Sequence, residues 1–398
     1  MTSRSGPART RLRLTVILFT LAVVLSVAPA QAAATWTKVT SPNRGTVASA
    51  LQDVVMVPGA VPATTAWAVG YYYDSNLAAY RTMTQRFNGT SWSIVPSVNA
   101  GATGYSQLNR VDATSTSNVW AIGSLVERYN GTNWVAMSSP AGVALRGLDV
   151  VSPSEVWVAG YSGSAATVAQ WKNGTWTTRY TQASTGRHLT VFEAIAVDAT
   201  GQIWAVGWDR DYNAPGRPVS SLVVHYNGMS WTRETTPNPA NRNTLMDVVA
   251  LGNGEVFAVG VAQDTSGGGI TPRSLMLRRQ GVGSGTWSSL IVPQGEAGSQ
   301  DQLLSVAAVS SSSVWSVGYY SSPSSGLYEP LLVHWTGTGG RHPRGLAAQS
   351  RAHGVRPCLG CLGDLGRRPV GGRLHGLAVG RERHPDPERH RRLNRNPA

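Results

Sequence analysis

The pentapeptide Ile203-Trp204-Ala205-Val206-Gly207 decides the fold, because variants of it occur six times in the sequence. The large aromatic residues of the six copies are Trp67, Trp120, Trp157, Trp204, Phe257 and Trp315. They are 53, 37, 47, 53 and 58 residues apart, a period typical of propeller blades or solenoid repeats. The chain is therefore expected to consist of repeated units that pack against one another.

Each copy has the same neighbours along the chain. An apolar run with the rhythm Leu-x-x-Val precedes it, as in Leu245 and Val248. An Asn-Gly turn and a second Trp follow it, as in residues 226–231. Asn-Gly between two apolar runs is the strongest short signal for a hairpin, since both residues tolerate the positive φ of a type I′ turn. Each repeat is thus predicted to contain four strands.

The strand around each aromatic residue is apolar at consecutive positions, as in residues 156–159. This pattern indicates burial on both faces of a sheet, and radially packed four-stranded blades provide such burial while leaving only short edges. We predict an all-β fold, a β-propeller of six recognisable four-stranded blades, with seven in an intact parent. Trp36 resembles the last strand of a repeat, so we expect an N-terminal outer strand to close the propeller.

The formal net charge of +13 is concentrated at the two ends of the chain. The first 32 residues contain four Arg, and residues 341–398 contain 13 Arg against four acidic residues. The basic and acidic side chains of residues 33–340 therefore balance. Because a basic field is the feature that attracts nucleic acid, the repeat region gives no reason to expect a nucleic-acid partner.

Residues 1–32 have the features of a secretory signal. They begin with basic residues, continue with an apolar core over 14–27, and end with the small-x-small pattern of a cleavage site at 30–32. The apolar core is shorter than the roughly 20 residues that a membrane-spanning helix needs, although a retained membrane anchor is the alternative. We expect the mature protein to be secreted, monomeric and without a membrane segment.

Residues 341–398 differ from the rest of the chain. They contain no Trp, Tyr, Phe or Lys and five of the eight His, so they resemble a GC-rich coding sequence translated in the wrong frame. We expect a signal peptide at 1–32, a β-propeller repeat domain at 33–340, and an Arg-rich, irregular, frameshifted tail at 341–398. A genuine basic tail that binds anionic polymers and an unrecognised small domain are the alternatives. Cys358 and Cys361 lack a second pair of zinc ligands.

Loop lengths predict where a ligand binds. Second-to-third and blade-to-blade connections lie on one face of a propeller, and here they are long and varied, so we call this the elaborated face; the other is the plain face. The aromatic rings of the elaborated face suit sugars and protein hot spots. The candidate ligand-binding residues are therefore Tyr72, Tyr73, Tyr105, Tyr212, Tyr320 and Tyr328. A shared packing role is expected for the aromatic residues directly after the repeat Gly, namely Tyr71, Tyr161, Trp208 and Tyr319.

No catalytic set emerges from the sequence. Of the three His in the repeat region, His225 and His334 occupy equivalent repeat positions, and His188 stands alone in a connecting segment, which does not favour Ser-His-Asp chemistry. Residues 209–213 begin like a calcium loop but lack the Glu at its twelfth position. The Asn-Gly-Thr triplets are formal glycosylation acceptors that hairpin turns explain. No metal or cofactor is expected.

The predicted function is a secreted, non-catalytic binding module that uses the elaborated face against a polysaccharide or a cell-surface protein. The alternative is an enzyme, a hydrolase or lyase that acts on polysaccharide through carboxylates of the loops. Its candidate residues are Asp74, Asp209, Asp211 and Glu329. Two-carboxylate glycosidase chemistry needs a pair about 5–10 Å apart.

The repeats resemble the kelch and galactose-oxidase-like propeller superfamily, and more closely the Trp-Ala-Val-Gly repeats of secreted actinobacterial proteins, over about residues 35–340. Kelch blades carry a Gly-Gly pair where this chain has one Gly, as in Val69-Gly70. The region also lacks the Cys that a galactose oxidase copper site needs and the Ser-x-Asp-x-Gly-x-x-Trp boxes of sialidases. The resemblance implies the fold, and no enzyme's active residues can be carried over.

Overall fold

The computed structural model describes residues 37–341, with gaps at 46, 63, 102–103, 183–185, 266–270, 282, 284 and 338–339. The chain divides into two units, Met1–Ala33 and Ala34–Ala398, and every described residue belongs to the second. The described residues form strands and turns, and none of them belongs to a helix that could cross a membrane. The predicted signal peptide, Trp36 and all of the tail after 341 lie outside the described residues, so the domain boundaries stay predictions.

Four sheets of the described part of the chain have four strands each, in consecutive antiparallel order. The first consists of β1 (Ser49–Met56), β2 (Thr65–Asp74), β3 (Ala79–Asn88) and β4 (Trp92–Val95). The second consists of β5 (Leu108–Ser115), β6 (Asn118–Gly123), β7 (Val126–Tyr129) and β8 (Trp134–Met137). The third consists of β9 (Ala144–Ser152), β10 (Glu155–Ser162), β11 (Ala165–Lys172) and β12 (Thr175–Thr181). The last consists of β21 (Gln300–Ser310), β22 (Ser313–Ser321), β23 (Tyr328–Trp335) and β24 (Gly340–Arg341).

The remaining described sheet has eight strands, because one parallel bridge between Val219 and Arg242 joins two four-stranded units. The first unit consists of β13 (His188–Val197), β14 (Ile203–Asp211), β15 (Val219–Tyr226) and β16 (Trp231–Arg233). The second consists of β17 (Arg242–Ala250), β18 (Val256–Asp264), β19 (Thr271–Gln280) and β20 (Thr286–Leu290). We number the four-stranded units blades 1 to 6 in chain order.

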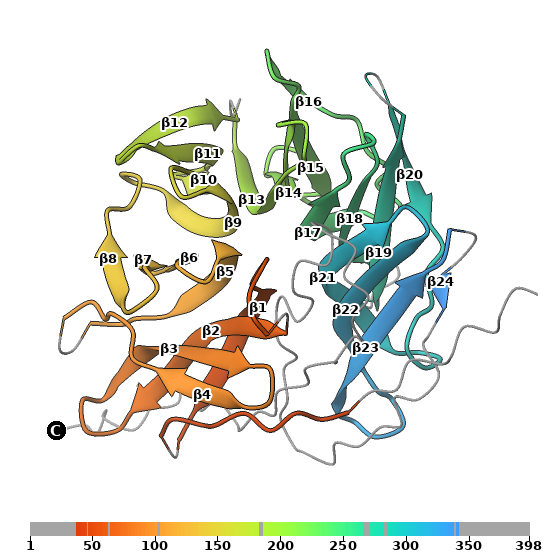
Figure 1. Cartoon of the computed structure of the whole chain (residues 1–398). Helices are drawn as coiled ribbons and strands as arrows, with labels where there is room; N and C mark the ends of the chain where they lie inside the picture. Colours follow the sequence, from red (N-terminus) through yellow and green to blue (C-terminus); the bar gives the residue numbers. More distant parts are fainter. Residues whose placement is uncertain are drawn as a thin grey trace, which may run out of the picture. The chain divides into compact units, whose positions relative to one another are not determined.

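Consecutive blades pack through their first strands, β1 against β5, β5 against β9, β9 against β13, β13 against β17 and β17 against β21 (Figure 1). The second strand of each blade is buried on both faces, as its unbroken apolar pattern predicts. In β14, Trp204 and Val206 join the core between blades 4 and 5, while Ala205 joins the core between blades 3 and 4. This is the arrangement of β-propeller blades, and the all-β class is confirmed.

Side chains of the third strand cover most of the repeat aromatic rings. His225 stacks on Trp204 with the ring centroids 3.7 Å apart, and His334 stacks on Trp315 at 3.9 Å. Arg128 occupies the same position in blade 2, with its Cζ 5.7 Å from the Trp120 ring. Residues at this position face the ring directly across the strand pair. The two His therefore act in packing, which explains why they recur at one repeat position.

The Asn-Gly turns form two kinds of hairpin. Asn173 and Gly174 both have positive φ (49° and 94°), as the predicted type I′ turn requires. At Asn227-Gly228 only the Gly has positive φ (96°). There the Asn227 side chain accepts the backbone N–H groups of Met229 and Ser230, each at 2.9 Å. The turn at Asn227-Gly228 is stable because the Asn227 side chain replaces a backbone acceptor.

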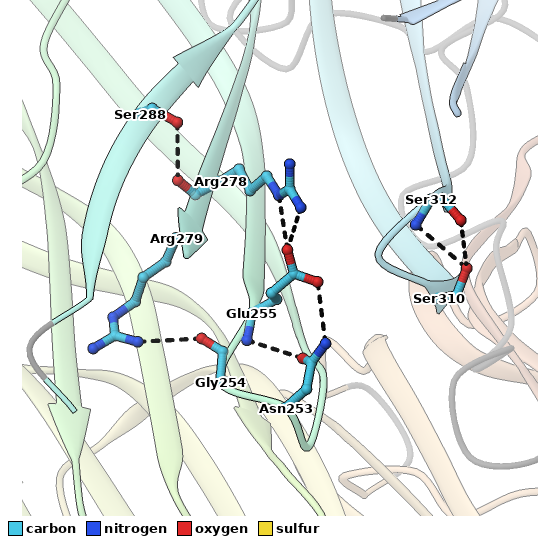
Figure 2. Close-up of polar contacts among 8 residues, drawn as sticks. All are labelled: Asn253, Gly254, Glu255, Arg278, Arg279, Ser288, Ser310 and Ser312. Carbon is cyan, nitrogen blue, oxygen red and sulfur yellow. Dashed lines mark hydrogen bonds and ion pairs between the residues drawn. The ribbon is translucent and has the colours of Figure 1, made fainter. Parts of the chain in front are cut away.

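Figure 2 shows the plain face at blade 5 and the neighbouring turn of blade 6. Glu255 accepts hydrogen bonds from Arg278 and from Asn253 Nδ2. Arg279 is 1% exposed and donates to the carbonyl of Gly254 at 3.2 Å, with its Cζ 4.8 Å from the Trp204 ring. These charged groups are paired with one another or with the backbone, so at blade 5 of the plain face they serve to hold the turns together.

Carboxylates of several first strands link successive blades. Asp53 of β1 accepts the N–H of Val111 in β5 at 2.8 Å, and Asp247 of β17 accepts that of Val306 in β21 at 2.9 Å. Arg110 interacts with both carboxylates and donates to the Met246 carbonyl at 3.4 Å. Burial raises the pKa of Asp53 to about 7, although Arg110 acts in the opposite direction. The first strands thus meet around a cluster of charged groups in which Asp53 is buried and Arg110 and Asp247 are partly buried.

The described part of the N-terminal segment, residues 37–44, forms no strand. It contacts blade 1 in the way that the connection between blades 1 and 2 contacts blade 2. Gln85 Nε2 donates to the Pro42 carbonyl at 2.7 Å. The equivalent contact of blade 2 runs from the Val98 N–H to Glu127 Oε2 at 2.9 Å. Proline has no N–H to donate. Blade 1 therefore has the amide donor Gln85 at the position where blade 2 has the carboxyl acceptor Glu127. The segment therefore enters blade 1 as blade-to-blade connections do.

The predicted closure of the propeller by an N-terminal strand is not shown by the structure. β24 pairs with β23 at His334 and Trp335, so the outer edge of the last described sheet is occupied there by the chain's own continuation. None of the described sheets closes on itself. The number of blades in an intact parent and the role of Trp36 stay predictions.

Candidate functional site

The prediction that the connections of the elaborated face are the longer ones holds only in part, because residues 124–125 and 163–164 form short turns on this face and residues 57–64 form a long connection on the plain face. Segments 96–107, 212–218 and 291–299 separate strands on the elaborated face, whereas residues 116–117 and 173–174 are sufficient on the plain face. Backbone hydrogen bonds fasten the long segments to the blades; the Ser106 N–H, for example, donates to the Tyr80 carbonyl at 2.9 Å. The described residues of these segments thus present side chains at fixed positions on the elaborated face.

Four tyrosines of blade 1 and the following segment form the first group on this face, the tyrosine cluster. Tyr80 of β3 makes edge-to-face contacts with Tyr71, Tyr73 and Tyr105, with ring centroids 5.2–5.4 Å apart. Tyr105 is 54% exposed, and its hydroxyl donates to Gln107 Oε1 at 2.6 Å. Burial, and then the neighbouring tyrosines, raise the pKa values of Tyr80 and Tyr105, so these phenols stay neutral at physiological pH.

Of the two β2 tyrosines predicted to bind a ligand, Tyr72 and Tyr73, the structure leaves only Tyr73 accessible. Tyr73 and Tyr105, both predicted as ligand-binding residues, come together through Tyr80. Tyr72 is 7% exposed and lies in the core of blade 1 with the Arg44 Cζ 4.8 Å from its ring, so its ring is not available to a ligand. Successive strand residues point to opposite faces, which separates Tyr72 from Tyr71 and Tyr73. Alternation in β2 places Tyr72 on the other face from Tyr71 and Tyr73, and the packing of blade 1 shows that this is the buried one.

Tyr212, also predicted, is part of a basic group at the end of β14, the arginine cluster (Arg210, Tyr212, Arg217 and Arg242). The Cζ atoms of Arg210 and Arg217 lie 4.9 and 5.8 Å from the centroid of the Tyr212 ring. Arg210 pairs with Val219 in β15, which in turn bridges to Arg242 in β17. Sequence reasoning missed the arginines, because the strand pairing that gathers them is not visible in the sequence.

Tyr320 and Tyr328, the remaining predicted residues, lie in blade 6. The Tyr320 hydroxyl donates to Glu329 Oε2 at 2.9 Å, and burial followed by Glu329 raises its pKa to about 12. Glu329 also accepts the Ser325 hydroxyl at 3.0 Å. Tyr328 is 49% exposed and makes a perpendicular contact with Tyr319 at 5.2 Å. The Tyr320 hydroxyl is therefore occupied, whereas the Tyr328 ring faces solvent.

His188, which stands alone in a connecting segment in the sequence analysis, lies in strand β13 and is held between two carboxylates. Its Nδ1 lies 2.9 Å from Asp209 Oδ1, and its Nε2 lies 3.5 Å from Asp211 Oδ1. Arg233 pairs with the other oxygen of Asp209 at 2.9 Å. Hydrogen bonds from the Asn213 backbone are the first cause of a lowered Asp211 pKa. An imidazole oriented by a carboxylate is able to transfer protons.

The four candidate carboxylates of the enzyme alternative do not form one site. Asp74 caps its own turn by accepting the N–H groups of Asn76 and Leu77, and Glu329 is bonded within blade 6. Only Asp209 and Asp211 are brought together, by their shared contacts with His188. No group of three or more metal-ligating side chains is placed to hold an ion in the described part of the chain.

No protein-family model matches the chain, and no curated protein matches it. Among solved structures, YCF48 from Cyanidioschyzon merolae has 15% identity and a TM-score of 0.47, covering 77% of this chain and 88% of its own. The polysaccharide lyase PL25, an ulvan lyase, has 10% identity and a TM-score of 0.47, covering 69% and 77%. The β-propeller domain of the trilobed protease from Pyrococcus furiosus has 8% identity and a TM-score of 0.42, covering 76% and 85%.

The comparisons correct one expectation of the sequence analysis, namely that the protein is not an enzyme. A polysaccharide lyase is among the similar structures, so the absence of a recognised catalytic motif does not support that conclusion. At these identities the likeness concerns the fold alone, and the specific kelch and actinobacterial resemblance stays a prediction. The chain is similar to proteins with the β-propeller fold.

Proposed function

We propose that the elaborated face binds a polysaccharide and that the mature protein acts outside the cell. The observation that carries the proposal is the tyrosine cluster, in which four rings from two strands and one connecting segment support one another in edge-to-face contacts. Tyrosine rings offer a flat apolar surface and a hydroxyl able to bond sugar hydroxyls. A cell-surface protein is the alternative ligand, because such rings also serve as protein hot spots.

The described residues that flank Tyr105 are fastened by hydrogen bonds within the protein. Arg81 donates to the Gly101 carbonyl at 2.7 Å, and the Ala100 N–H donates to the Ser106 hydroxyl at 2.9 Å. Binding to an ordered surface avoids the entropy cost of ordering a loop. This pre-organisation supports the tyrosine cluster as a binding surface for a neutral ring.

Replacing both Tyr73 and Tyr105 with Ala is expected to weaken polysaccharide binding by roughly 30- to 900-fold, because each ring of such a surface contributes about 1–2 kcal/mol. Affinity electrophoresis of the full-length chain in gels that contain arabinan, xylan or polygalacturonate measures the effect. Met229→Ala removes an exposed side chain from the plain face and serves as the control. Retardation that survives in the double variant would exclude the tyrosine cluster as the site.

A second candidate function, cleavage of the bound polysaccharide, rests on the environment of His188. Each ring nitrogen of His188 lies close to one carboxylate, and Arg233 pairs with one of these carboxylates. The imidazole provides a proton-transfer group and Arg233 provides a cation beside it. Loss of a general acid or base typically reduces rates by 10²- to 10⁴-fold. His188→Gln is therefore expected to reduce release of reducing ends at least 100-fold, with retardation in the gels unchanged. Wild-type chain that cleaves none of the polymers would remove this candidate.

A further inference from the structure

We propose that the arginine cluster binds an anionic group of the ligand, a uronate carboxylate or a sulfate, so that the polysaccharide is an acidic one. The inference rests on the proposed function and specifies the charge of its ligand. Guanidinium groups present planar pairs of donors that match the oxygen atoms of carboxylates and oxoanions. A cluster of unpaired guanidinium groups on the elaborated face is therefore a recognition site for such a group.

The positions of the three arginines bring their charges to one side of blades 4 and 5. Arg210 and Arg217 both approach the Tyr212 ring, at 4.9 and 5.8 Å from its centroid. Arg210 and Arg242 flank Val219 on neighbouring strands. Side chains of directly paired strand residues point to the same face of a sheet. Tyr212 therefore lies among cations, and its ring stabilises them.

These arginines have no carboxylate partner within the described ranges. The arginines that do form ion pairs there are Arg233, Arg278 and Arg279. The Nε atoms of Arg210 and Arg242 are buried without a hydrogen-bond acceptor. A buried donor left unsatisfied is destabilising, and neighbouring like charges repel one another. Because these Nε atoms are buried, an anion would be bound through the terminal guanidinium nitrogens, and it would reduce the repulsion between the arginines, which is why the cluster suits an anionic ligand.

Hydrogen bonds within the protein fix the scaffold beneath the arginine cluster. The Val219 N–H donates to the Asn241 carbonyl at 3.1 Å, and the Asn241 side chain accepts the Thr265 N–H at 3.2 Å. Asn243, 1% exposed, bonds the backbone of Ala240 through both side-chain atoms. The seam between blades 4 and 5 thus holds Arg210 and Arg242 in position. The site is local, since the repeat region as a whole carries no net charge.

Pairs of polymers that differ only in charge test the proposal on the full-length chain. Polygalacturonate is compared with its methyl ester, and dextran sulfate with dextran, by affinity electrophoresis. We expect stronger retardation by the charged member of at least one pair. The pair that shows the difference identifies the anion as a carboxylate or a sulfate. Equal retardation by charged and neutral members, or by neither, would overturn the proposal.

Variants locate the effect on the chain. Arg217 is exposed, so Arg217→Gln is not expected to disturb folding, and it should weaken binding to the charged polymer by roughly 10-fold, the value of one charge-assisted hydrogen bond. Arg210→Gln should act in the same direction, and Arg210→Lys should restore part of the binding. Arg179→Gln makes the same change on β12, at an exposed position away from the cluster, and should have no effect.

The outcomes separate this proposal from the proposed function. If the tyrosine variants weaken binding to charged and neutral polymers while Arg217→Gln changes neither, the polysaccharide site stands and the anion site does not. An equal loss in Arg217→Gln and Arg179→Gln would show that net charge alone drives the binding, and would also overturn the anion site. Single-stranded DNA bound more tightly than every polysaccharide, with the same loss in Arg217→Gln, would assign the cluster to nucleic acid instead.

Discussion

Gly207→Ala is expected to lower the free energy of unfolding by about 3 kcal/mol or more, because the new methyl group has no space. A Cβ at this position would lie 2.0 Å from the Val191 carbonyl oxygen and 2.8 Å from the Phe192 Cα. Both are backbone atoms of β13, which bulges between Phe192 and Ala194, so relief requires movement of a whole strand. The same crowding occurs at the other repeat glycines, namely Gly70, Gly123, Gly160, Gly260 and Gly318.

Urea unfolding followed by tryptophan fluorescence measures this effect. Gly252→Ala is the matched control, because the nearest atom to its new Cβ is a side-chain carbon, Ala199 Cβ, at 3.4 Å. The control should unfold at nearly the wild-type urea concentration. A Gly207→Ala protein with an unchanged midpoint would contradict the close approach of β13 and β14.

Stability is expected to fall as pH rises from about 5 to 9, and Glu127→Gln should remove part of that slope. Burial raises the pKa of Glu127 from 4.5 to about 8, against the opposing effect of the Val98 N–H. Because the folded pKa lies above the unfolded one, the stabilising contribution is complete below 4.5 and is lost as pH rises through 8. One such group changes stability by about 1 kcal/mol per pH unit in that window. Asp53, with a pKa of about 7, acts in the same direction.

The Gln side chain of the Glu127→Gln variant keeps a neutral acceptor for the Val98 N–H, so its stability should be near wild type at pH 5 and higher at pH 9. Gln85→Glu is the reciprocal variant. It removes the donor to the Pro42 carbonyl and buries a carboxylate, so it should be destabilised increasingly as pH rises. Urea midpoints measured at pH 5, 7 and 9 test both variants. Identical slopes for wild type and Glu127→Gln would show that the buried Glu127 is ionised when folded.

The candidate sites were only partly visible in the sequence. Aromatic residues of the long loops could be picked out, and Tyr73, Tyr105 and Tyr212 do lie in clusters of the elaborated face. Tyr72 was selected with them because composition ignores the alternation of strand faces, which sends its ring into the core. His188 was set aside because its partners, Asp209 and Asp211, are about twenty residues away in sequence and meet it only across the β13–β14 pair.

The sequence by itself determined the repeated four-stranded unit. Apolar runs such as residues 203–206 dictate burial on both faces, and the Gly after each run allows the bulged neighbouring strand to approach. Both the apolar run and the Gly are local properties of the sequence, and they recur in each repeat. Only the tertiary structure decided which polar residues meet, because those contacts depend on strand register and on packing between blades. The arginine cluster shows the difference: Arg210 and Arg242 are 32 positions apart and become neighbours through one bridge at Val219.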